Sequence, residues 1–219
     1  SEYGSSGFKD LRKTKEEVEK IGRVLENNGY DVKIYSKSKG NAESFVALSG
    51  KAPSILHIAT HGFYYTPEEA KDNDFLSGYT DAMSLSGLVF SGGNADWLGK
   101  KKADGVLGGV LTAKDIANLN LKGTDLAVLS ACKTGQGKAT FEGLYGLQRA
   151  FKKAGVNTII MSLWSVDDKV TSEFMVAFYE RLADEGNAWN KRKAFEETRE
   201  IIRKKYPDPY LWAAFVMLD

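Results

Sequence analysis

The sequence contains a single cysteine, Cys132, which follows an apolar run over residues 126–131. A second apolar run, over residues 55–59, is followed in the same way by His61 and Gly62. A thiol becomes a nucleophile when a nearby base removes its proton, and one imidazole can later return that proton to a leaving amine. A cysteine and a histidine that each follow a strand-like run therefore predict nucleophilic catalysis by a Cys–His pair.

The two residues are 132 − 61 = 71 positions apart, which suits neighbouring parallel strands joined by a crossover. Ligands of open parallel sheets bind beyond the carboxyl ends of the strands, where both residues are expected. The main-chain N–H groups of Gly62 and Cys132 would form an oxyanion hole for the substrate carbonyl. A lone cysteine after a strand is usually a small buried hydrophobic residue. The hypothesis of Cys–His catalysis therefore depends on both residues, because each follows an apolar run.

The elements that must position these residues alternate along the chain. Helical patterns cover residues 13–28, 41–48, 111–115, 141–154, 168–185 and 189–205, and strand patterns cover 31–36, 55–60, 125–131, 157–164 and 213–218. Thr14 is expected to cap the first helix, with Glu17 three residues on. The Gly-, Ser-, Asn- and Asp-rich stretch over 62–103 is expected to be a long functional loop with a hairpin or an edge strand. The alternation predicts an α/β fold with a mostly parallel sheet and helices on both faces.

The composition excludes several classes of protein. With 30 basic and 29 acidic residues, the chain offers no charge that calls for nucleic acid or an anionic membrane. One cysteine excludes an intramolecular disulfide and a cysteine-based zinc site, and we expect no metal and no cofactor. No apolar stretch approaches a membrane span and no signal peptide is visible, so a cytoplasmic protein is expected. We expect a flexible segment over 1–9 and one domain over 10–219.

Two other motifs fit their chemistry poorly. Residues 135–140 suggest a phosphate loop, but Ala139 stands directly after Lys138, where the pattern needs Ser or Thr. This mismatch argues against a nucleotide-binding domain. His57 and His61 have the spacing of a zinc protease, but they lie in a strand-like run without the required Glu, so His57 is expected to pack beneath the site.

Four segments, in this order, resemble the successive motifs of the CHAT family, whose members are caspase-like cysteine peptidases related to separase. They read Leu56-His-Ile-Ala-Thr-His-Gly62, Leu129-Ser-Ala-Cys-Lys-Thr-Gly135, Glu142-Gly-Leu-Tyr-Gly-Leu-Gln-Arg-Ala-Phe151 and Ser162-Leu-Trp-Ser-Val-Asp-Asp168. The resemblance implies a caspase–haemoglobinase-like three-layer sandwich. It also implies a cysteine-type endopeptidase with His61 as general acid and base, Cys132 as nucleophile, and Gly62 with Cys132 at the oxyanion hole.

The fourth motif resembles the part of separases that shapes the pocket for a basic residue before the scissile bond. Asp168, with Asp167 beside it, would pair there with a Lys or Arg side chain of the substrate. An Asp that opens a helix is also an ordinary N-terminal cap. Glu142, at the start of another helix, would either stabilise the helix dipole or contact substrate.

The resemblance also bears on partners. CHAT domains usually follow tetratricopeptide repeats, so we expect a protein or peptide substrate and a regulatory repeat region or activator protein outside this chain. The alternative function is a catalytically inactive caspase-like scaffold for protein interaction or signalling. The presence of both His61 and Cys132 favours the peptidase.

Overall fold

The computed structural model describes residues 7–8, 11, 13–100, 107–130 and 141–219, and the side chains of 141–145 are not described. Its central sheet has the strand order β1-β5-β6-β7. The bounds are β1 Ile55–Ile58, β5 Leu126–Leu129, β6 Thr158–Ser162 and β7 Phe215–Leu218. Strands β1, β5 and β6 pair in parallel and β7 pairs antiparallel with β6, which confirms the mostly parallel sheet.

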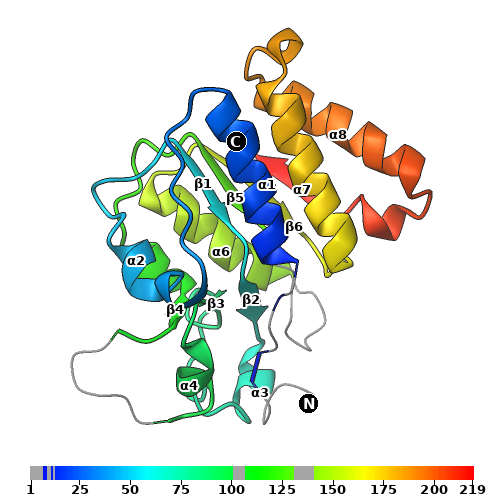
Figure 1. The fold of residues 1–219 in the computed structure, drawn as a ribbon. Coiled ribbons are helices and arrows are strands. Elements are labelled where there is room, and N and C mark those ends of the chain that lie inside the picture. The colour runs from blue at the N-terminus through cyan, green and yellow to red at the C-terminus, as the bar shows by residue number, and fades with distance from the viewer. Residues whose placement is uncertain (1–6, 9–10, 12, 101–106, 131–140) are drawn as a thin grey trace.

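Helices cover both faces of this sheet (Figure 1). One face carries α1 (Thr14–Asn27), α7 (Asp168–Ala183) and α8 (Lys191–Lys205). The other face carries α2 (Ala42–Val46), α5 (Ala113–Ile116) and α6 (Phe141–Ala154). Short 3-10 helices lie at Lys37–Lys39, Glu185–Asn187 and Pro209–Leu211. The arrangement is the three-layer α/β sandwich that the sequence predicts.

Strand β5 shows why the central strands have nearly continuous apolar sequences. Leu126 and Val128 pack in the cluster that contains the α1 and α7 side chains. Ala127 and Leu129 point the other way and pack in the cluster that contains the α6 side chains. Because successive side chains of a strand face opposite sides, a strand covered on both faces needs an apolar residue at every position.

The stretch over 62–103 contains the hairpin expected there, but its described residues do not form one long loop. It contributes most of a second, antiparallel sheet of order β2-β3-β4, with bounds β2 His61–Tyr64, β3 Ser86–Val89 and β4 Val110–Thr112. Two short helices, α3 (Pro67–Ala70) and α4 (Gly93–Trp97), lie beside it, at the bottom of Figure 1. Trp97 and Leu76 fill a separate apolar cluster under these elements.

Two local predictions are wrong. Residues 31–36 form no strand, and Ile34 and Tyr35 are 45% and 52% exposed, so these apolar side chains have no sheet to cover. Thr14 is the first helical residue of α1 rather than its cap, and its hydroxyl donates to the Leu11 carbonyl. Helix α5 does have a side-chain cap: Thr112 and Asp115 form a reciprocal capping box.

None of the helices in the described ranges is long and apolar enough to cross a membrane. The domain boundary expected at residue 10 stays a prediction. Within the segment before it, Gly7 and Phe8 are buried against α4.

Candidate functional site

The two predicted catalytic residues follow two strands that are direct neighbours in the parallel sheet. Ile58, the last residue of β1, is the register partner of Leu129, the last residue of β5. His61 comes 61 − 58 = 3 residues after the first, and Cys132 comes 132 − 129 = 3 residues after the second. Cys132 itself lies outside the described residues, and the description of this chain segment ends at the buried Ser130.

His61 stands at the point where the chain leaves the parallel sheet and enters the small one. It is the first residue of β2, and its register partner is Val89 of β3. The Thr60 hydroxyl donates to the Val89 main-chain carbonyl, which fixes the turn between the sheets. Gly62 is buried opposite Leu88. The backbone that carries the imidazole is therefore held by β3 and not by the parallel sheet.

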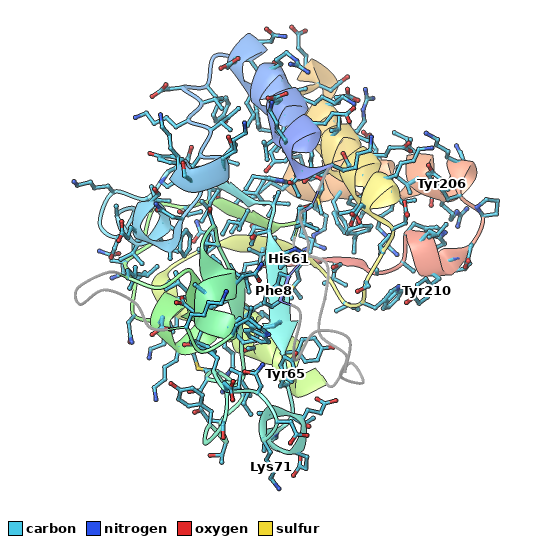
Figure 2. All side chains as sticks on the ribbon, turned by 60° about the horizontal axis from the view of Figure 1, so that its bottom comes forward. Phe8, His61, Tyr65, Lys71, Tyr206 and Tyr210 are labelled. Atoms are coloured by element: carbon cyan, nitrogen blue, oxygen red, sulfur yellow. The ribbon has the colours of Figure 1, made fainter. Side chains whose placement is uncertain are left out.

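The imidazole of His61 lies against an aromatic group on the side of the small sheet. The Phe8 and His61 ring centroids are 5.2 Å apart with the planes tilted by 37°, and Figure 2 shows the two side chains next to one another. Phe8 also meets Trp97 edge-on at 4.8 Å. Trp97 in turn packs edge-on against Phe63 of β2 at 5.1 Å. One side of His61 is thus contacted by an apolar cluster.

His57 has different surroundings and packs against α1 and α7, and its place beneath the site stays a prediction. Its Nε2 is 2.9 Å from Oε1 of Glu17 on α1, and its Nδ1 is 3.3 Å from the hydroxyl of Tyr179 on α7. The side chains of His57 and Glu17 are only 9% and 3% exposed. An imidazole that donates from Nε2 to a carboxylate presents Nδ1 as an acceptor for the phenol. Burial, with the Glu17 charge as the smaller cause, raises the pKa of Tyr179 above its usual range.

The two predicted acidic substrate contacts have different local roles. The Asp167 carboxylate accepts hydrogen bonds from the main-chain N–H groups of Lys169 at 3.0 Å and Val170 at 3.3 Å, so Asp167 is the N-cap of α7. Asp168 is exposed at the first position of the helix and lines a small recess. The other residues that line the recess are Leu11, Lys13, Thr14, Glu17, Ser130 and Thr171. Asp168 is therefore brought beside Ser130, two residues before the cysteine.

Glu142 lies in the first turn of α6, and its side chain is outside the described part of the chain. The same motif contains Gly146, whose role is evident from packing. A Cβ at this position would lie 2.2 Å from Oγ of Ser86 on β3 and 2.9 Å from the Ala82 carbonyl oxygen. Only glycine allows α6 to approach the small sheet this closely.

The structure adds residues that the sequence does not single out. Phe8 contacts the His61 ring, and Asn94, 86 residues later in the chain, hydrogen-bonds to Phe8. Glu17 fits a capping pattern, yet it is buried against His57, 40 residues away. The only sequence signal for Glu17 is its place near the apolar stripe of the first helix. The Phe8–Asn94 and Glu17–His57 contacts both depend on tertiary packing, which a local pattern does not show.

Comparison with known proteins agrees with these motifs. The family model described as "CHAT domain" matches residues 2–219. Among curated proteins, tetratricopeptide repeat protein 28 of Mus musculus and the protein of the same name from Homo sapiens are each 32% identical over 111 residues. These alignments cover 50% of this chain and only 4% of either relative. With nearly the whole sequence matched and the motifs in the expected order, the chain belongs to the CHAT domain family.

Proposed function

We propose that this protein is a cysteine endopeptidase in which Cys132 is the nucleophile and His61 is the general acid and base. The shared register carries the proposal, because paired parallel strands end at Ile58 and Leu129 and each proposed catalytic residue follows three positions later. Strands that end at matched positions bring the chain segments after them to one edge of the sheet.

In the proposed reaction the imidazole of His61 takes the thiol proton and the Cys132 sulfur attacks the carbonyl carbon of the scissile peptide bond. The N–H groups of Gly62 and Cys132 stabilise the negative charge that develops on the carbonyl oxygen. The carbon–nitrogen bond breaks as His61 gives the proton to the departing amine. A water molecule, deprotonated by the same imidazole, then hydrolyses the thioester and restores the thiol.

Substrate preference belongs to the same proposal. Asp168 lies exposed in a recess beside Ser130, where its carboxylate is available to a Lys or Arg side chain of the substrate. Asp167 is committed to the cap of α7, so its contribution to substrate binding would be through long-range charge. Glu142 remains a proposed substrate contact from α6.

The regulatory setting is also proposed. The curated relatives are named tetratricopeptide repeat proteins, which supports a repeat region or an activator protein as the partner that controls this domain. A cytoplasmic location is also part of the proposal. A chain with one cysteine forms no disulfide within itself, and proteins of the reducing cytoplasm rarely contain disulfides.

Covalent labelling tests the function. An acyloxymethyl ketone peptide with Lys at the position next to the warhead should label the wild-type protein at Cys132, as detected by intact mass. His61→Ala should slow labelling by about 10²–10⁴-fold, the contribution expected of a general base. If wild type and His61→Ala label equally fast, the Cys–His proposal fails and an inactive scaffold is the better description.

A second probe that carries Leu in place of Lys tests the pocket. Asp168→Asn should reduce the preference for the Lys probe by roughly tenfold, which corresponds to about 1.4 kcal/mol. Asp208→Asn, at an exposed acid before the 3-10 helix at Pro209–Leu211, is the matched control and should leave the preference unchanged. An Asp168→Asn protein that keeps the full preference would refute the pocket assignment.

A further inference from the structure

Phe8, which precedes α1 in the chain, is attached to α4 by a two-way hydrogen-bond contact. The main-chain N–H of Phe8 donates to Oδ1 of Asn94 at 2.6 Å, and Nδ2 of Asn94 donates to the Phe8 carbonyl at 2.9 Å. One side-chain amide thus satisfies both main-chain polar groups of one residue. Such a contact recognises peptide backbone irrespective of the side chain that the backbone carries.

Gly7 makes this docking selective for glycine at the preceding position. Its φ is +69°, in the left-handed region, and a Cβ built there would lie 2.8 Å from Oδ1 of Asn94. A side chain at this position would therefore be strained and would also collide with the residue that holds the backbone. The docked unit is recognised as a glycine followed by another residue.

Phe8 supplies the second half of the recognition. Its ring is buried, with only 9% of the residue exposed, and packs with Trp97, Phe63 and Val89 in the apolar cluster of the small sheet. On its other side the ring faces His61 at a centroid distance of 5.2 Å. Figure 2 shows Phe8 and His61 at the centre of this face, with Tyr65 farther along the small sheet. The niche therefore accepts an aromatic side chain that reaches the imidazole.

We propose that the niche formed by Asn94, Trp97 and His61 is a binding site for a glycine–aromatic dipeptide unit. In this structure the chain's own Gly7-Phe8 fills it and restrains catalysis by covering His61. This inference rests on the proposed peptidase function, since a cover matters only if the imidazole must exchange protons with thiol and substrate. Asn94 is exposed, so the hydrogen-bonded end of the docked unit lies at the surface, while the Phe8 ring is buried.

The dipeptide unit that fills the niche comes from the same chain because covalent attachment favours its binding. A dipeptide makes few contacts, and tethering replaces a bimolecular binding step by an intramolecular one with a high effective concentration. A protein that competes for Asn94 or pulls on the N-terminal segment would release Phe8 and uncover His61. The niche is thus the proposed point of control over the same site.

Histidine NMR tests the docking directly, because the chain has only two histidines. The ring signals of His57 and His61 are assigned with His61→Ala. Phe8→Ala and Asn94→Ala should each shift the His61 ring signals and leave those of His57 in place. The rate at which diethyl pyrocarbonate modifies His61 should rise at least about threefold, since a buried ring no longer covers it.

Three further variants control the design. Gly7→Ala should uncover His61 as Phe8→Ala does, because its Cβ displaces the segment from Asn94. Phe8→Tyr keeps a ring in the niche and should leave His61 protected. Tyr35→Ala removes an exposed aromatic side chain outside the Phe8 cluster and should change nothing at His61. Equal His61 shifts and modification rates in wild type, Phe8→Ala and Gly7→Ala would overturn the proposed docking.

Labelling of Cys132 separates this inference from the proposed function. If the wild-type protein labels, the uncovered variants Phe8→Ala and Gly7→Ala should label at least about threefold faster, and unchanged or slower labelling would overturn the restraint. Slower labelling would mean that Phe8 positions His61 for catalysis. If no variant labels while the His61 signals still respond as expected, the peptidase proposal fails and the dipeptide site stands on the NMR result.

Discussion

His57 and His61 are four residues apart, but they belong to different sheets and have opposite surroundings. His57 lies in the parallel sheet, between a carboxylate on α1 and a phenol on α7. His61 lies in the small antiparallel sheet, with Phe8 on one side. In the parallel sheet, the histidine connects the sheet to the helices α1 and α7. The small sheet holds its histidine where the chain passes from one sheet to the other, beside Phe8.

The largest expected difference in stability is between the two histidine substitutions. His57→Ala should lower the free energy of unfolding by about 3 kcal/mol, because it leaves the Glu17 carboxylate buried without its partner. His61→Ala should lower it by about 1 kcal/mol or less, as a partly exposed side chain is lost. Urea unfolding followed by circular dichroism measures both values.

Two substitutions of Glu17 serve as controls for this comparison of the two histidines. Glu17→Gln keeps an acceptor for His57 Nε2 and should lose less stability than Glu17→Ala. Equal losses for His57→Ala and His61→Ala would show that the Glu17–His57 contact does not hold α1 to the sheet. The contrast between the two regions would then be wrong.

A smaller effect is expected at the start of α7, where two adjacent acids have separate roles. Asp167→Ala should cost about 1 kcal/mol of stability through loss of the N-cap. Asp168→Ala should cost only about 0.3 kcal/mol, because it removes just a favourable charge near the helix N-terminus. Thermal unfolding of both variants measures the difference, and the reverse order would place the cap on Asp168.

The smallest effect concerns tyrosines in the two regions at alkaline pH. Burial, with a lesser contribution from Glu69, raises the pKa of Tyr64 in β2 to about 12, while the pKa of Tyr179 on α7 is raised further. The unfolded chain releases the Tyr64 proton near pH 10, so the stabilisation is fully present below that pH and is lost as the pH rises towards about 12.

Wild type should therefore lose about 0.4 kcal/mol more stability than Tyr64→Phe between pH 8 and about pH 10. Urea unfolding at the two pH values gives this difference, and spectrophotometric titration should show one fewer late-ionising tyrosine in the variant. Identical pH profiles would mean that Tyr64 titrates like an exposed tyrosine, and the small sheet would be more open than described.

The parts of the fold that can be predicted from sequence are those with strong local patterns. The apolar runs at β1, β5 and β6 predict a buried parallel sheet, and the amphipathic residues 141–154 predict α6 with the same bounds. Of the small sheet, the sequence predicts only a hairpin or an edge strand within 62–103, because glycine and polar residues interrupt that stretch.

The residues of the candidate site also differ in how clearly the sequence indicates them. His61 stays a prediction based on the apolar run before it, and Asp168 one based on its place at the start of a helix in a recognisable motif. Glu17 is misread since Thr-x-x-Glu has the local form of a capping box, while burial against β1 gives the carboxylate another partner. The contact between Phe8 and Asn94 spans 86 residues, so no local pattern could indicate it.

The pairing of Ile58 with Leu129 also has a consequence for how the protein folds. Closing this contact requires a loop of 129 − 58 = 71 residues, whose entropy must be lost before the β1–β5 pair gains anything in return. During synthesis, the ribosome releases the segment with His61 well before the segment with β5 exists. The proposed pair of reactive residues can therefore form only after the segment with β5 has been synthesised.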